Sequence, residues 1–240
     1  MFRLATCNEF IELREKYPQV LSCIDEKFCW GLKMNGYLLI IDQIYKQKPQ
    51  KILEAGAGLN LIFFRLFGKE LEYWMIDNGS LYPDPIKFRE KISNMKSINF
   101  VDGLLGDFST GLPDNYFDMI FSISVLEHTP RDTPKSVEKI CKDMYRLLKP
   151  GGCILHTIDI TPNDDIGRQY LKFIKKTGFI LYEEPKELDW NVNTRHNQIL
   201  LEKLDTVYLS YYEKHNKLNE PIYYYHFGSI IVMAFKPAEK

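Results

Sequence analysis

The stretch KILEAGAGLN, residues 51–60, decides the fold. Its first half, Lys51 to Ala55, is short and mostly apolar, which predicts a strand, and glycines follow at once. From Leu59 to Phe67 apolar residues recur at helical spacing. Glycines between a strand and a helix let the backbone turn tightly and let a ligand approach with no Cβ in the way. The stretch therefore predicts the first strand–turn–helix unit of an α/β fold, with a ligand at the turn.

Two details of this turn separate the ligands that such a unit can bind. The dinucleotide fingerprint Gly-x-Gly-x-x-Gly needs a third glycine at position 61, where this chain has Leu61. An acid, Glu54, stands two residues before Gly56. A carboxylate there suits a ligand with an ammonium or sulfonium group and is a poor neighbour for a pyrophosphate. The turn thus disfavours NAD and FAD, although Gly-x-Gly alone is common to their sites.

Outward from this stretch, short apolar segments alternate with helical ones. Further strands are predicted over residues 71–76, 97–101, 116–125, 153–160, 179–182 and 229–235. Asp84-Pro85 and Thr133-Pro134 each combine a capping residue with proline at the first helical position, and another helix is predicted over 164–177. Strands alternating with helices of this length predict a parallel, doubly wound α/β sheet.

The whole chain, 1–240, reads as one domain with two additions. Residues 1–48 show helical spacing and predict an N-terminal helical cap. Residues 184–226 fall outside the strand–helix rhythm and form an insertion before the last strand. An insertion over the open end of the sheet is a natural place to recognise a substrate, so we expect it to form the acceptor site.

Acids also follow the second and third predicted strands. Asp77 ends the second strand, where a carboxylate can accept hydrogen bonds from a ribose diol, and Asn78 follows it. Gly106-Asp107-Phe108 comes after the third strand and offers an acceptor for an adenine amino group beside a ring that can stack on it. Together these residues predict a nucleoside pocket.

Three further segments complete a set of motifs: LPDNYFD at 112–118, VLEH at 125–128 and LKPGG at 148–152. In this order, the set resembles the class I S-adenosylmethionine (SAM)-dependent methyltransferases, specifically the group with VLEH after the fourth strand and LKPGG before the fifth. The resemblance covers residues 50–182. It implies a Rossmann-like sheet of seven strands whose last strand is antiparallel. At Asn60 the chain departs from the family, in which a glycine is common.

The resemblance also implies which residues bind SAM. Glycines and acids of the first turn would hold the methionine part, Asp77 the ribose, and Asp107 with Phe108 the adenine. The fourth strand would approach the methyl group through two serines. The predicted cofactor-binding residues are Glu54, Gly56, Ala57, Gly58, Asp77, Asn78, Asp107, Phe108, Ser122 and Ser124.

An alcohol acceptor needs a general base or a metal to take its proton. His128 follows the fourth strand and His156 lies within the fifth, so both are near the edge where this fold binds ligands and are the candidate catalytic bases. His156 alternates with apolar residues and is equally compatible with a core position. The histidines show no metal-ligand spacing, and no dedicated metal site is predicted.

Composition excludes several functional classes. The formal net charge is −1 and no basic patch is visible, which disfavours a nucleic-acid partner. The five cysteines are scattered, which argues against disulfides and structural zinc. No signal peptide or membrane span is apparent, so a cytoplasmic location is expected. Composition does not indicate the oligomeric state.

The sequence thus predicts transfer of the SAM methyl group to a small-molecule or saccharide acceptor, with oxygen the favoured atom. Methylation of an amine or a carboxylate fits the same motifs. Two alternatives come from other classes: a nicotinamide-dependent oxidoreductase, which Leu61 and Glu54 disfavour, and a SAM-binding scaffold without catalysis.

Overall fold

The computed structural model describes residues 1–23, 32–56, 61–80, 84–95, 98–108, 110–128, 134–160, 166–185 and 228–238. The helices are α1 (Cys7–Lys16), α2 (Pro18–Leu21), α3 (Leu32–Gln47), α4 (Ile62–Phe67), α5 (Pro85–Ser93), η2 (Leu126–His128, a 3-10 turn), α6 (Pro134–Leu147) and α7 (Ile166–Thr177). The strands are β1 (Phe2–Leu4), β2 (Lys51–Ala55), β3 (Glu72–Asp77), β4 (Asn99–Asp102), β5 (Phe117–Ile123), β6 (Leu148–Ile160), β7 (Ile180–Leu181) and β8 (Gly228–Phe235). The predicted insertion at 184–226 lies almost wholly outside the described residues.

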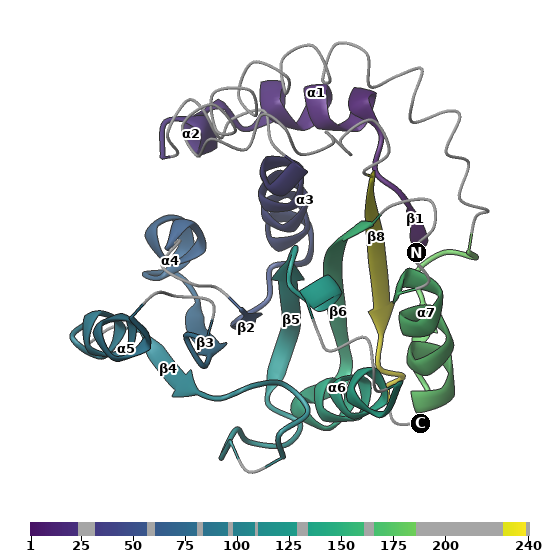
Figure 1. The fold of residues 1–240 in the computed structure, drawn as a ribbon. Helices are drawn as coiled ribbons and strands as arrows, with labels where there is room; N and C mark the ends of the chain where they lie inside the picture. Colours follow the sequence, from purple (N-terminus) through teal and green to yellow (C-terminus); the bar gives the residue numbers. More distant parts are fainter. Residues whose placement is uncertain are drawn as a thin grey trace, which may run out of the picture.

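The described strands form one mixed sheet in the order β1-β8-β6-β5-β2-β3-β4, with β7 also paired to β8. Strands β2 to β6 are parallel, whereas β8 runs antiparallel to β6. This confirms the predicted Rossmann-like α/β fold with an antiparallel last strand. Helices cover both faces of the sheet, with α3 and α4 on one side and α6 and α7 on the other (Figure 1).

The strand β1 is an addition that the sequence does not predict, since residues 1–48 read as helical. Phe2 pairs with Val232 of β8, and the amide of Met233 donates to the carbonyl of Met1 at 2.8 Å. An edge strand exposes a row of unpaired backbone groups, and β1 covers part of the outer edge of β8. Three residues are too few to show the alternation from which strands are predicted.

Helix α3 approaches the sheet unusually closely at Gly36. A Cβ added to Gly36 would lie 2.6 Å from Cγ2 of Ile123 and 2.8 Å from Oγ1 of Thr157, which is closer than real Cβ atoms come. Glycine therefore lets the helix backbone rest directly on the ends of β5 and β6. The first turns of α3 are thereby held over the carboxyl edge of the sheet.

Within the described part of the chain, none of the helices combines the length and the apolar character needed to cross a bilayer.

We expect Gly36→Ala to lower the free energy of unfolding by about 1–3 kcal/mol, because the added methyl overpacks the contact with Ile123 and Thr157. The measurement is urea denaturation followed by circular dichroism. Gln43→Ala, on the same helix and half-exposed, is the control and should change stability by less than about 0.5 kcal/mol. A Gly36→Ala protein as stable as wild type would mean that α3 does not rest on the sheet in this way.

Candidate functional site

The site is positioned by β2, which lies between β5 and β3 in the sheet (Figure 1). Leu53 of β2 pairs with Ile120 of β5 on one side and with Trp74 of β3 on the other. The chain moves outward in opposite directions from this point, so the loops that leave β2 and β5 diverge at the carboxyl ends of the strands, which is where open α/β sheets bind ligands. The predicted cofactor residues of β2, β3 and β5 stand around this edge.

Glu54 is a buried acid at the end of β2. Its side chain is 4% exposed and accepts a hydrogen bond from the hydroxyl of Tyr73. Burial, helped by the charge of Asp77, raises the pKa of Glu54 to about 8, although the Tyr73 hydrogen bond acts against this. A carboxyl group with this pKa is mostly protonated and neutral at pH 7. A cation placed beside it would favour the ionised, negatively charged form.

Gly56 begins the turn after β2 with φ at +71°, a conformation that favours glycine. Its amide donates to the carbonyl of Ile76 at 2.9 Å, which ties the turn to β3. An added Cβ would lie 2.6 Å from Cγ1 of Val125. The glycine therefore makes room for the first residue of the VLEH segment, which sequence reasoning did not connect to it. Ala57 and Gly58 lie outside the described residues.

Asp77 and Asn78 follow at the end of β3, on the strand next to Glu54. The Oδ1 atom of Asp77 accepts from the amide of Gly79 at 2.7 Å, and Oδ1 of Asn78 accepts from the amide of Ser80 at 3.0 Å. These bonds fix both side chains to the loop after β3. They hold Asp77 at the carboxyl edge of the sheet. The sequence predicts that Asp77 accepts hydrogen bonds from a ribose there.

Asp107 and Phe108 lie beyond β4 and are both exposed; the Phe108 side chain is 49% exposed. The guanidinium of Arg146 stands 5.9 Å from the Phe108 ring centre. The amide of Gly106 donates to Oδ2 of the buried Asp143 at 2.8 Å, and this anchors the loop to α6. The loop is thus fixed at its base and presents an aromatic face to solvent.

Ser122 and His156 face each other inside the sheet. The Oγ atom of Ser122 lies 2.8 Å from Nδ1 of His156, and both residues are 0% exposed. Burial lowers the pKa of His156 to about 3, so the ring is neutral at physiological pH. A base of this strength with no exposed surface is poorly placed to take a proton from an acceptor. His128, in contrast, is exposed at the end of η2.

A second group of polar residues stands at this edge, and only Ser124 of this group is among the predicted site residues. Ser124 follows β5 with φ at +50° and is 4% exposed. Glu127 of η2 is 7% exposed, and Asp159 stands at the carboxyl end of β6. Burial raises the pKa of Glu127 and of Asp159, and the charge of Asp159 also raises that of Glu127. The position of Asp159 at a strand end, like that of Asp77, was the available signal.

Among the residues that the structure describes, no three His, Cys, Asp or Glu side chains are grouped so that they could hold a metal ion.

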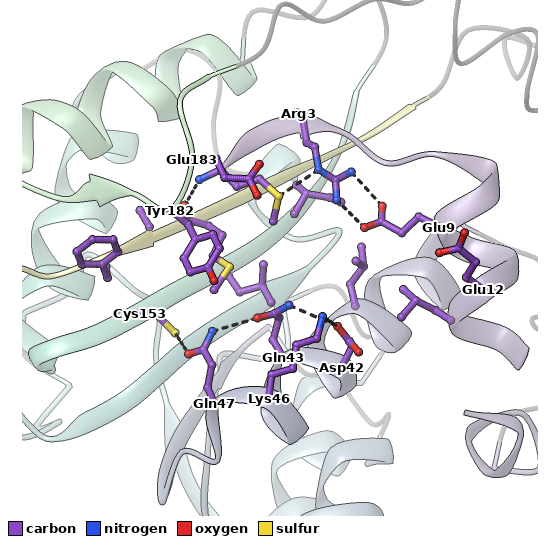
Figure 2. A pocket seen from close by; sticks show the side chains of 18 of the residues that line it. Arg3, Glu9, Glu12, Asp42, Gln43, Lys46, Gln47, Cys153, Tyr182 and Glu183 are labelled. Atoms are coloured by element: carbon purple, nitrogen blue, oxygen red, sulfur yellow. Dashed lines mark hydrogen bonds and ion pairs between the residues drawn. The ribbon is translucent and has the colours of Figure 1, made fainter. Parts of the chain in front are cut away.

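A cavity of about 650 Å³ lies elsewhere, between α1, α3 and the face of β6 and β8 (Figure 2). It opens beside Cys153, near the amino end of β6, and therefore away from the carboxyl edge. Several of its charged groups pair with one another: Arg3 with Glu9 at 2.5 Å, and Asp42 with Lys16 at 2.7 Å. These residues form ion pairs with each other, and the cavity is separate from the carboxyl edge of the sheet.

Comparisons with known proteins agree with this geometry. Residues 53–156, which run from β2 to β6, match a family model described as a methyltransferase domain. This segment of the chain is therefore similar to methyltransferase domains. No curated protein sequence is significantly similar to this chain.

Solved structures share the methyltransferase fold at low sequence identity. One is a putative sarcosine dimethylglycine methyltransferase from Galdieria sulphuraria (14% identity, TM-score 0.56, covering 83% of this chain and 86% of that one). A second is the [4+2]-cyclase SpnF (16%, 0.53, 79% and 75%). A third is phosphoethanolamine N-methyltransferase 2 of Haemonchus contortus with phosphomonomethylethanolamine and S-adenosylhomocysteine (19%, 0.52, 78% and 49%). These likenesses establish the fold, which also hosts a reaction other than methylation.

We expect the ring of His156 to remain neutral from pH 5 to pH 9 in the folded protein. Because its pKa is lowered from 6.5, protonation favours the unfolded chain, and His156 should therefore cost stability as the pH falls below about 6.5. The measurement is the imidazole carbon–proton NMR shift against pH, with the urea-unfolded protein as control. A His156 signal that titrates near pH 6.5 in the folded protein would contradict its burial.

Proposed function

We propose that this domain binds SAM at the carboxyl edge of β2, β3 and β5 and transfers its methyl group to a small molecule. The observation that carries the proposal is Glu54, a buried carboxyl at the glycine turn with no cation beside it among the described residues. The methionine part of SAM brings an ammonium and a sulfonium group, which would supply the missing charge. Asp77 would accept from the ribose on the neighbouring strand, with Asn78 beside it.

The remaining predicted residues extend the same assignment. Phe108 offers an exposed ring for the adenine, with Asp107 next to it. Ser122 is enclosed by the sheet and would act through its hydrogen bond to His156. Ser124 follows β5 and would lie nearer the methyl group. Gly58 and Ala57 stay predictions, since they lie outside the described residues.

SAM supplies a methyl group on a positively charged sulfur, which leaves as a neutral thioether. The protein's task is therefore to align the acceptor and to take its proton, if it has one to lose. The carboxyl edge of β5 and β6, under the first turns of α3, is where the acceptor would meet the methyl group. Residues 184–226 would complete this acceptor site, as the sequence predicts. An oxygen atom, including one of a saccharide, and a nitrogen atom are both compatible with this proposal.

We expect Asp77→Ala to lose most of the affinity for S-adenosylhomocysteine, because the ribose hydroxyls lose their acceptor at a cost of about 1–3 kcal/mol, or roughly 5- to 150-fold. The measurement is isothermal titration calorimetry, with NAD titrated in parallel. Asp102→Ala is a matched control, since Asp102 pairs with Asp77 in the register of β3 and β4 but forms an ion pair with Arg89 at 2.8 Å. Equal affinity in Asp77→Ala and wild type would contradict the ribose assignment.

We also expect S-adenosylhomocysteine binding to release a proton at pH 7. Glu54 carries a proton there because its pKa is raised to about 8, and the ligand's ammonium group favours the ionised form. Affinity should therefore rise between pH 6 and pH 8, by up to about tenfold per unit. Calorimetry in buffers of different ionisation enthalpy measures the released proton, and Glu54→Gln should abolish it. A wild-type enthalpy that is independent of buffer would contradict the contact between Glu54 and the ligand.

A further inference from the structure

Six side chains at the carboxyl edge have buried polar atoms without a hydrogen-bond partner. They come from α3, from the segment after β5, from η2, from β6 and from β8, and four of the six are at least 95% buried. The atoms are Asn35 Oδ1, Ser124 Oγ, Glu127 Oε2, Thr157 Oγ1, Asp159 Oδ1 and Ser229 Oγ. We call these residues the edge cluster.

Several contacts show that the edge cluster is one place. The amide of Ser124 donates to the carbonyl of Thr157 at 2.9 Å. Gly36, next to Asn35, sits directly against Oγ1 of Thr157. Asp159 is paired with Ser229 in the register of β6 and β8. The backbone contacts therefore bring α3, β5, β6 and β8 together at this point.

The acids of the edge cluster belong to the same place. The hydroxyls of Ser124 and Ser229 lie close enough to Asp159 to lower its pKa, yet neither makes a hydrogen bond of good geometry. The negative charge of Asp159 helps to raise the pKa of Glu127. Glu127 and Asp159 therefore form an interacting pair of carboxyl groups.

Unpaired buried polar atoms are costly, at about 1–3 kcal/mol each. Folded proteins leave few of them, and a group of six in one place calls for an explanation. Elsewhere in the described chain, Thr110 Oγ1 and His156 Nε2 also have no partner, but they are single atoms. The buried acids Asp42 and Asp143 are paired: Asp42 accepts from Tyr17 at 2.9 Å, and Asp143 accepts from Arg146 at 2.7 Å. The edge cluster is therefore built to pair with a molecule that the protein binds.

The hydrogen-bonding properties of these unpaired atoms indicate which kind of ligand would bind to them. The unpaired oxygens of Asn35, Glu127 and Asp159 are acceptors when the carboxyl groups are ionised, and the three hydroxyls can accept as well. A complementary ligand must therefore donate several hydrogen bonds. Because burial raises the pKa of both carboxyl groups, a positive charge on that ligand would favour their ionised, proton-accepting form. Lys33 on α3 and His128 on η2 lower the pKa of Asp159 and so only partly offset the negative charge.

We propose that the edge cluster binds the protonated amino group of the methyl acceptor, and that the pair Glu127–Asp159 takes its proton before methylation. This inference rests on the proposed function and names its substrate class, a primary or secondary amine. The ammonium N–H bond breaks, an O–H bond forms on one carboxylate, and the freed nitrogen lone pair points at the electrophilic methyl carbon. One proton moves and no other reactant is needed.

Glu127 and Asp159 are strong enough as bases to take a proton from an ammonium group, but not from an alcohol. An alkylammonium group has a pKa of about 10, whereas an alcohol has a pKa close to that of water, about 16. Burial raises the pKa of both carboxyl groups toward that of an ammonium group, and the gap is then small enough for proton transfer. The gap to an alcohol remains large. This departs from the preference for oxygen that the sequence indicates.

The test uses the full chain saturated with S-adenosylhomocysteine and two small probes of equal shape, n-propylammonium and n-propanol. Carbon-13 NMR follows the side-chain carboxyl carbons of Glu127 and Asp159 during each titration. We expect the ammonium ion to shift both signals with a saturable response and n-propanol to leave them unchanged. Asp159→Asn and Glu127→Gln should each weaken ammonium binding at least tenfold, while Glu12→Gln, at the separate cavity, should not.

Three readouts keep the outcomes distinct. Ammonium ions that shift neither signal, or n-propanol that shifts them equally, overturn the inference. Calorimetry with S-adenosylhomocysteine reports the proposed function separately: wild-type protein that does not bind it contradicts that proposal. Thermal melting shows whether the two variants fold, and Ser229→Ala, a smaller change in the same cluster, should weaken ammonium binding as well. If Ser229→Ala and both acid variants fold and bind the ammonium ion like wild type, the cluster is not its site.

Discussion

The parallel pairing of β2 with β5 is the constraint on which the rest of the structure depends. These strands are separated by more than sixty residues, yet Ile52 pairs with Met119 and Glu54 with Phe121. The pairing makes the two strand ends neighbours, and the loops that follow them diverge. Glu54 and Asp77 lie on one side of that divergence, and Glu127 and Asp159 lie on the other. A shift of one residue in this register would turn Glu54 to the opposite face of the sheet.

The carboxyl edge of the sheet carries two different arrangements of buried acids, one on each side of the β2–β5 pair. On the side of β2 and β3, a single buried acid, Glu54, is held by Tyr73 and faces a glycine turn. On the side of β5 and β6, Glu127 and Asp159 influence each other and have unpaired oxygens. One setting suits the charged end of a donor, and the other suits the polar end of an acceptor. The two stand next to each other because β5 lies between β2 and β6.

The sequence was informative where a local pattern carries the fold. Strand–helix alternation, the glycine turn after Ala55 and the proline at position 85 predict elements that the structure contains, because hydrophobic period and capping act over a few residues. The edge cluster could not be predicted in this way. Asn35, Glu127 and Ser229 are far apart in the chain, and only the close approach of α3 at Gly36 brings them together. The burial of His156 likewise depends on its neighbours across the sheet, and alternation alone left it undecided.

The pairing of β1 with β8 has a consequence for the order in which this protein is made. Phe2 is synthesised before its partner Val232, which follows 230 residues later in the sequence. Until β8 emerges, the outer edge of β6 is an open strand with its hydrogen-bonding groups exposed, and such edges invite pairing with other chains. Strand β1 therefore has no partner strand until β8 is made. Strand β8 then covers the open edge of β6 and pairs with β1, so this side of the sheet is completed only when β8 joins it.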